Sequence, residues 1–145
     1  MENPKLLIDL TKLKENARLL VELCRRHNIE PVGVTKVACG DPKVAQAMLA
    51  GGMQMLAESR IENARRLKQA GITAPLLLLR LPMPSQADAV VPLFKCSLNS
   101  ELKTIAALNA AAAKAGLVHE IILMVDLGDL REGIWPEQLE ETVRP

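Results

Sequence analysis

The sequence predicts an α/β protein built from repeated parallel βα units. Short apolar runs alternate with longer amphipathic segments, and the runs start about every 20–25 residues, the length of a minimal βα unit. Five runs are apolar throughout, which is typical of parallel strands covered on both faces. A doubly wound sheet and part of a (β/α)₈ barrel both fit this rhythm. No G-x-G-x-x-G motif follows a run, which weakens the dinucleotide-binding version.

The first units carry clear start signals. An apolar run at 6–8 opens the chain, and Thr11 is a reasonable N-cap for the helix that follows. A β-branched strand is expected at 32–35, and Asp41-Pro42 places a capping carboxylate and a proline at the start of the next helix. Further strands are expected at 53–57, 76–79, 95–98 and 120–125.

The later helices are punctuated by capping residues and prolines. Ser59 to Glu62 has the S-x-x-E form of a capping box. A short helix is expected within 84–91, and Asn99 or Ser100 is expected to cap an alanine-rich helix after it. Pro136 opens a final helix.

Composition and charge exclude several classes of protein. The apolar fraction of 49% is enough for a packed core, so disorder is not expected. A net charge of +1 predicts no general attraction to nucleic acid or membranes. The three cysteines form neither a CxxC motif nor a Cys/His cluster, so we expect no disulfide framework and no metal site. With no signal-peptide pattern at 1–5, a cytoplasmic protein is expected.

Function is expected where the strands end, because both architectures place their sites at the carboxyl ends of parallel strands. Lys36 stands out there, since it lies between Val34-Thr35 and Val37-Ala38, and apolar surroundings would favour the neutral amine that attacks carbonyls. The alternative is a lysine that extends out of a strand end and pairs with a neighbouring carboxylate. The other strand-end candidates are Glu58, Ser59, Arg60, Arg80, Asn99, Ser100, Asp126, Asp129 and Arg131.

Four segments in order resemble one family. "VTKVACG" at 34–40 resembles the lysine segment at the first barrel strand of fold-type III pyridoxal phosphate (PLP) enzymes, with the alanine/ornithine racemase branch as the best match. "PKLLIDLTKLKEN" at 4–16 looks like that family's first strand and helix, and "ESRIEN" at 58–63 like its next loop. "VDLGDLREG" at 125–133 is similar to the family's D-T-G-M-x-R-x-G loop.

The resemblance implies an amino-acid racemase. Lys36 would form the aldimine with PLP and exchange the Cα proton on one face of an amino acid of the ornithine or alanine class. Asp126 and Arg131 fall on the family's loop aspartate and arginine, so the resemblance implies that both contact the substrate, with Arg131 near its carboxylate. The alternative for Arg131 is an ion pair with Asp129 or Glu132 that only shapes the loop. A homodimer or larger assembly is expected.

Departures from the family pattern limit this reading. Gly40 stands where alanine racemases have a tyrosine, and Met124 where some have a lysine; both favour the ornithine-racemase-like branch. The chain has no tyrosine, whereas the family uses one as the base on the opposite face. Five strands also fall short of eight. We therefore expect 1–145 to be a partial N-terminal barrel domain, without the remaining strands and the C-terminal β-domain, and inactive alone.

Two alternatives stay open. One is a non-enzymatic PLP-binding homeostasis protein of the related single-barrel family. Its glycine-glutamate-asparagine motif is only loosely matched at 57–59, and the loop at 126–133 argues against it. The other is an inactive barrel fragment whose open strand edges drive self-association.

Overall fold

The computed structural model describes residues 5–144, and its centre is a five-stranded parallel sheet. Its strands lie in sequence order, and every neighbouring pair is parallel. A doubly wound sheet would reverse its strand order at a switch point, so the sequential order favours the barrel alternative. The strands are β1 (Val32–Val34), β2 (Met55–Glu58), β3 (Leu76–Leu78), β4 (Cys96–Asn99) and β5 (Glu120–Leu123).

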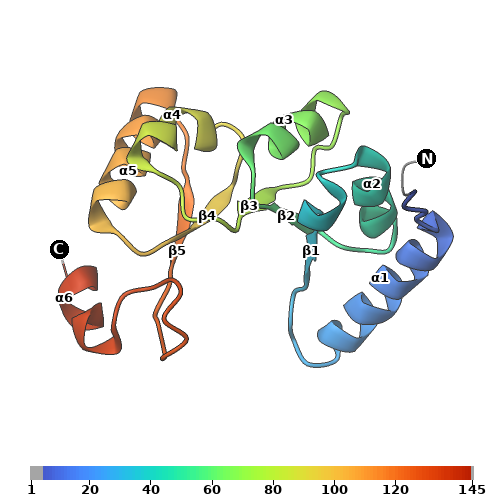
Figure 1. The fold of residues 1–145 in the computed structure, drawn as a ribbon, viewed down its shortest axis with the longest axis horizontal. Coiled ribbons are helices and arrows are strands. Elements are labelled where there is room, and N and C mark those ends of the chain that lie inside the picture. Colours follow the sequence, from blue (N-terminus) through green and yellow to red (C-terminus); the bar gives the residue numbers. More distant parts are fainter. Residues whose placement is uncertain (1–4, 145) are drawn as a thin grey trace.

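Helical segments connect the strands and confirm the predicted βα repeat. They are α1 (Leu10–Arg25), η1 (Lys36–Ala38), α2 (Pro42–Ala50), α3 (Ile61–Gln69), η2 (Pro84–Gln86), α4 (Ala87–Val90), α5 (Leu102–Ala115), η3 (Pro136–Gln138) and α6 (Leu139–Val143). Figure 1 shows the helices α2 to α5 in an arc along one side of the sheet. Parallel strands joined by crossovers of one hand produce this arrangement.

The main core lies between this arc and the outer face of the sheet. Leu56 of β2 and Leu76 of β3 are fully buried there against Leu67 of α3 and Leu108 of α5. Alternate strand residues point to opposite faces, so this layer uses one half of each strand. Burying four such leucines stabilises the fold by several kcal/mol, at about 1.5–3 kcal/mol for each side chain.

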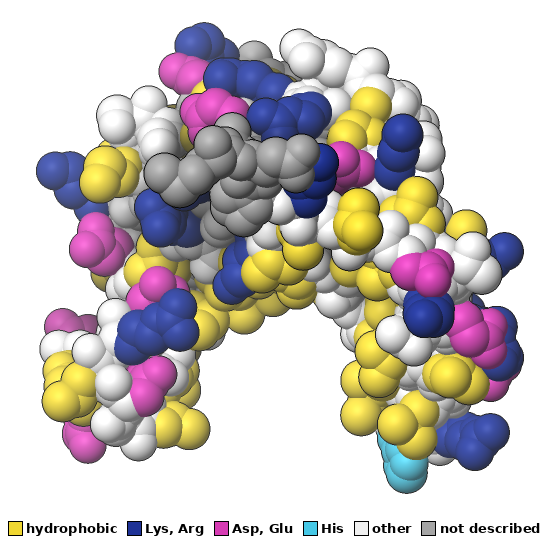
Figure 2. Space-filling view, turned by 45° about the vertical axis from the view of Figure 1, so that its right-hand side comes forward, with side chains coloured by type: hydrophobic (Ala, Val, Ile, Leu, Met, Phe, Trp, Pro, Cys, Tyr) yellow, Lys and Arg dark blue, Asp and Glu magenta, His cyan; other side chains and the backbone are white. Residues whose placement is uncertain are grey.

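The inner face of the sheet is apolar but only partly covered by residues 5–144. Ala57, Leu77 and Cys96 form a small cluster there, with Val34 and Leu98 half-buried beside it. Figure 2 shows the molecule hollowed between two arms, with hydrophobic side chains along part of the hollow. In a closed barrel this face would be the packed interior.

Three predicted caps are wrong, each for a local reason. The carboxylate of Asp9, rather than Thr11, accepts the N–H bonds of the first turn of α1. The capping box at Ser59 does not form, because the side chain of Glu58 takes the Ser59 N–H at 3.1 Å and α3 begins after Arg60. Neither Asn99 nor Ser100 caps α5, which begins after Glu101 without a side-chain cap.

Other boundary signals are confirmed. Asp41 accepts the N–H of Lys43 at 2.8 Å and of Val44 at 3.2 Å, with Pro42 as the first residue of α2.

The expected opening strand is absent, since 6–8 is exposed and irregular. Pro4 and Pro145, the ends of the segment that carries the resemblance, lie outside the described residues.

Two kinds of feature are missing from residues 5–144. None of the helices there is both long and apolar enough to cross a membrane. Nor do three or more His, Cys, Asp or Glu side chains converge there in a group able to hold a metal ion.

Candidate functional site

The predicted site residues all follow strands, and parallel pairing brings them to one edge of the sheet. Lys36 follows β1, while Asp126 and Arg131 follow β5. Four strand spacings separate β1 from β5, roughly 19 Å along the sheet at about 4.8 Å each. The structure therefore places the two groups on the same rim but not in contact.

Lys36 opens the single turn η1, directly after the buried Thr35. Its side chain is exposed, as is that of Val37, so the expectation of apolar surroundings is wrong within residues 5–144. The reason is that the lysine leaves the strand at the open rim, where none of these residues covers it. Its amine forms no hydrogen bond or ion pair with another described residue, which leaves it available to a ligand.

The turn that carries Lys36 is packed tightly against α3. The N–H groups of Ala38 and Gly40 both donate to the carbonyl of Thr35, at 3.0 and 3.2 Å. Gly40 has a φ of +64°, and a Cβ there would lie 2.8 Å from the Cβ of Asn63. Gly40 is thus the small residue that this close approach requires.

A buried carboxylate ties this turn to its neighbours. Glu58, at the end of β2, is fully buried. Its Oε1 accepts the Thr35 hydroxyl at 2.7 Å, and its Oε2 accepts the Asn63 amide at 3.0 Å and the Ser59 N–H at 3.1 Å. These bonds join the residue before Lys36 to β2 and α3. The sequence placed Glu58 at a strand end, but no local signal showed that Thr35 and Asn63 would satisfy it.

The loop after β5 is organised around Asp126, which is buried. Its carboxylate accepts the N–H groups of Gly128 at 2.8 Å, Leu130 at 3.2 Å and Arg131 at 3.1 Å. These backbone donors, Gly128 first, lower the pKa of Asp126. Gly133 passes so close that a Cβ on it would lie 2.4 Å from the Asp126 nitrogen. The loop backbone therefore needs an acceptor side chain at Asp126 and a residue without a Cβ at Gly133.

Arg131 is exposed, and its backbone is held by Asp126. No ion pair joins its guanidinium to Asp129 or Glu132 within residues 5–144, so the loop-shaping alternative lacks the contact it needs. The group that shapes the loop is the Asp126 carboxylate. Among residues 5–144, the Arg131 guanidinium has no hydrogen-bond or ion-pair partner.

Asn99, another strand-end candidate, lies in a buried network. Its amide donates to the Ser97 hydroxyl at 2.9 Å. That hydroxyl lies 2.8 Å from Nε2 of His119, whose Nδ1 is 3.1 Å from the Phe94 carbonyl. Burial lowers the pKa of His119, which favours the neutral ring. These contacts join β4 to the start of β5.

Parallel βα units in sequence order, with polar groups gathered at the carboxyl rim, define part of an α/β barrel. The chain belongs to the family of the alanine racemase N-terminal domain, whose model matches residues 8–144. It is 43% identical over 143 residues to a lysine racemase of Thermotoga maritima and 38% identical over 142 residues to an ornithine racemase of Acetoanaerobium sticklandii. These matches cover 99% and 97% of the chain, and the chain spans 40% of each relative's length.

Solved structures support the same fold. An alanine racemase from Streptomyces lavendulae superposes with a TM-score of 0.81 at 25% identity, covering 92% of this chain and 35% of that one. A D-threonine aldolase from Filomicrobium marinum superposes at 0.80 with 19% identity, covering 98% and 40%, and shows the fold alone. The predicted fold class, part of an α/β barrel, is confirmed.

Replacing Glu58 with glutamine should destabilise the chain. A glutamine NH₂ would either face the Asn63 and Ser59 N–H donors or turn toward the Thr35 hydroxyl and leave those donors a neutral acceptor weaker than the carboxylate, at a cost of about 1–3 kcal/mol in the free energy of unfolding. Urea denaturation measures this loss. Glu62→Gln, a change on the exposed first turn of α3, is the matched control and should stay within about 0.5 kcal/mol of wild type. Equal stability of the two variants would contradict the role given to Glu58.

The loop at 126–133 should lose its order in acid. A folded-state pKa below the ordinary value means that Asp126 stabilises the loop above about pH 3.9 and stops doing so as the pH falls through its own lower pKa. The fluorescence of Trp135, the chain's one tryptophan, reports this change close to the loop. Asp126→Asn should abolish that transition, and an identical acid titration in both proteins would refute the assignment.

Proposed function

We propose that this chain carries the cofactor-lysine side of a PLP-dependent amino-acid racemase, with Lys36 as the lysine that holds PLP. One observation carries the proposal. In a chain of the alanine racemase N-terminal domain family, a lysine with an unpartnered amine stands at the carboxyl rim, directly after a residue fixed by buried hydrogen bonds. A fixed backbone with a free amine suits a side chain that must bond a ligand covalently.

The donor set fits PLP. A primary amine is the group that bonds the aldehyde of this cofactor, and Lys36 offers one at the rim. Arg131, on the loop after β5, offers a planar guanidinium suited to a carboxylate. When bound, PLP withdraws electrons from the substrate and makes its Cα proton acidic.

The chain's own residues would then divide the work. The Lys36 amine holds the cofactor and moves the Cα proton on one face of the amino acid. The Arg131 guanidinium binds and orients the substrate carboxylate. Asp126, which we predicted to contact substrate, serves the site by fixing the loop that presents Arg131. Racemisation also needs a proton donor or acceptor on the opposite face, and the 145 residues contain no tyrosine for this role.

A substrate with a second amine is the version we favour. The relatives named above are a lysine racemase and an ornithine racemase. Gly40 and Met124, the two residues that differ from the alanine racemase pattern, fit this branch. Acidic side chains at Asp129 and Glu132 follow the same strand as Arg131 and could receive a distal ammonium group.

Lys36→Ala should abolish covalent capture of PLP. After incubation with stoichiometric PLP and reduction with borohydride, the wild-type chain should carry its main stable adduct on the peptide containing Lys36, because a binding site favours its own lysine over the other primary amines. Mass spectrometry of the digested protein locates it. Lys43→Ala, which alters an exposed lysine on α2, is the control and should keep the adduct. If Lys36→Ala and wild type incorporated the same total amount of PLP, with the adducts on other lysines, the assignment would be overturned.

Self-association of the chain is a second property that the structure favours. The sheet ends in unpaired edges at β1 and β5 within the described residues. Apolar groups gather near the second edge, where Ile121 and Ile122 of β5 are 40% and 46% exposed and Leu117 and Val118 precede them. Open parallel edges with apolar neighbours pair readily with another chain.

Light scattering should therefore show dimers or larger species whose mass falls on dilution. Ile122→Lys should shift the chain toward monomer, since a charge would be buried at the paired edge. Leu19→Lys, at a similarly exposed leucine of α1, should leave the mass unchanged. A wild-type chain that stays monomeric at every concentration would rule this property out.

A further inference from the structure

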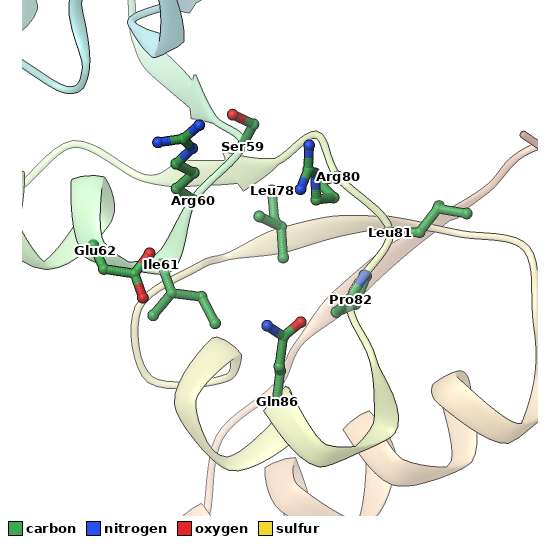
Figure 3. Close-up of a pocket in the computed structure, with 9 residues that line it drawn as sticks. All are labelled: Ser59, Arg60, Ile61, Glu62, Leu78, Arg80, Leu81, Pro82 and Gln86. Carbon is green, nitrogen blue, oxygen red and sulfur yellow. The ribbon is translucent and has the colours of Figure 1, made fainter. Parts of the chain in front are cut away.

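We propose that a pocket at the ends of β2 and β3, lined by neither Lys36 nor Arg131, binds an oxyanion. The pocket has a volume of about 380 Å³. Its rim carries Ser59 and Arg60, which follow β2, and Arg80, which follows β3. Figure 3 shows the two arginines on either side of Ser59, with Gln86 reaching toward them from η2.

The polar groups of this pocket are mainly donors. Within residues 5–144, neither Arg60 nor Arg80 forms an ion pair or a side-chain hydrogen bond, so both guanidinium groups are free to bind. Gln86 uses its Oε1 to accept the Met83 N–H at 3.0 Å, which leaves its NH₂ as the donor facing the pocket. Two guanidinium groups, an amide and a hydroxyl suit the several oxygens of a phosphate or carboxylate.

The acidic side chains nearby do not neutralise this site. Glu62 is the one acid that lines the pocket, and it pairs with neither arginine. Glu58 is adjacent in sequence, but its carboxylate is fully buried and its oxygens face Thr35, Ser59 and Asn63. The pocket therefore has two positive charges for one negative charge. An anion is the ligand that relieves the repulsion between them.

The remaining wall of the pocket is apolar. Ile61 and Leu78 are buried beneath it, and Pro82 lies on one side, while the Leu81 side chain points away from the other labelled residues (Figure 3). A pocket with an apolar wall and a few convergent donors is typical of small-molecule sites. The ligand class that fits is a small organic acid or phosphate ester. The oxyanion could belong to a separate molecule or to the phosphate of PLP.

Titration with inorganic phosphate, at constant ionic strength in chloride, tests the site without reference to racemase activity. Calorimetry should detect saturable binding to the whole chain, and Arg60→Gln and Arg80→Gln should each weaken it about tenfold, the loss of one charge-assisted contact. Arg65→Gln, an exposed arginine of α3 outside the pocket, is the matched control and should bind as wild type does.

Lys36→Ala should also keep phosphate affinity, so a failure of the cofactor proposal would leave this result standing. Absence of saturable binding, or an equal loss in Arg65→Gln, would overturn the pocket. The source of the oxyanion is separated by comparing PLP with pyridoxal, which lacks the phosphate. If Arg60→Gln weakens PLP alone, the pocket takes the cofactor's phosphate, and if it weakens neither, the pocket takes a separate anion.

Discussion

The parallel alignment of five strands in sequence order is the constraint on which the other features depend. Because each strand runs the same way, every loop that follows a strand emerges at one rim. Lys36, the pocket arginines and the Asp126 loop reach that rim from strands far apart in sequence. The same alignment puts the helices on the outer face, so the inner face stays apolar and only partly covered by residues 5–144.

Within this frame, two carboxylates hold the segments that carry Lys36 and Arg131. Glu58 fixes Thr35, and with it the turn that presents Lys36. Asp126 fixes the backbone of Arg131 through its own loop. In both cases an acidic side chain accepts hydrogen bonds and leaves the neighbouring basic side chain unpaired and exposed. Fixing the backbone next to an exposed side chain is a common way in which proteins preorganise a binding group.

The sequence predicted much of this from local rules. Asp41-Pro42 is a local signal for the start of α2, and apolar runs of strand length identify strands without tertiary information. Lys36 and Arg131 came from ordered motifs. The errors occurred where competing contacts and solvent exposure decide the outcome. The capping box at Ser59 could not form once Glu58 accepted the Ser59 N–H, and Lys36 lies at an open rim although its sequence neighbours are apolar. The pocket of Arg60 and Arg80 needs β2 and β3 side by side, a pairing that no local motif encodes.

The central claim is that Lys36 moves the Cα proton of an amino acid, and isotope exchange tests it most directly. A protein extended to the length of the lysine and ornithine racemases would be incubated with PLP and L-ornithine in deuterium oxide. The account predicts D-ornithine with deuterium at Cα, and loss of this exchange in Lys36→Ala while Lys43→Ala retains it. PLP binding at Lys36 without any exchange, with ornithine, lysine or alanine, would contradict the racemase and favour a cofactor-binding protein.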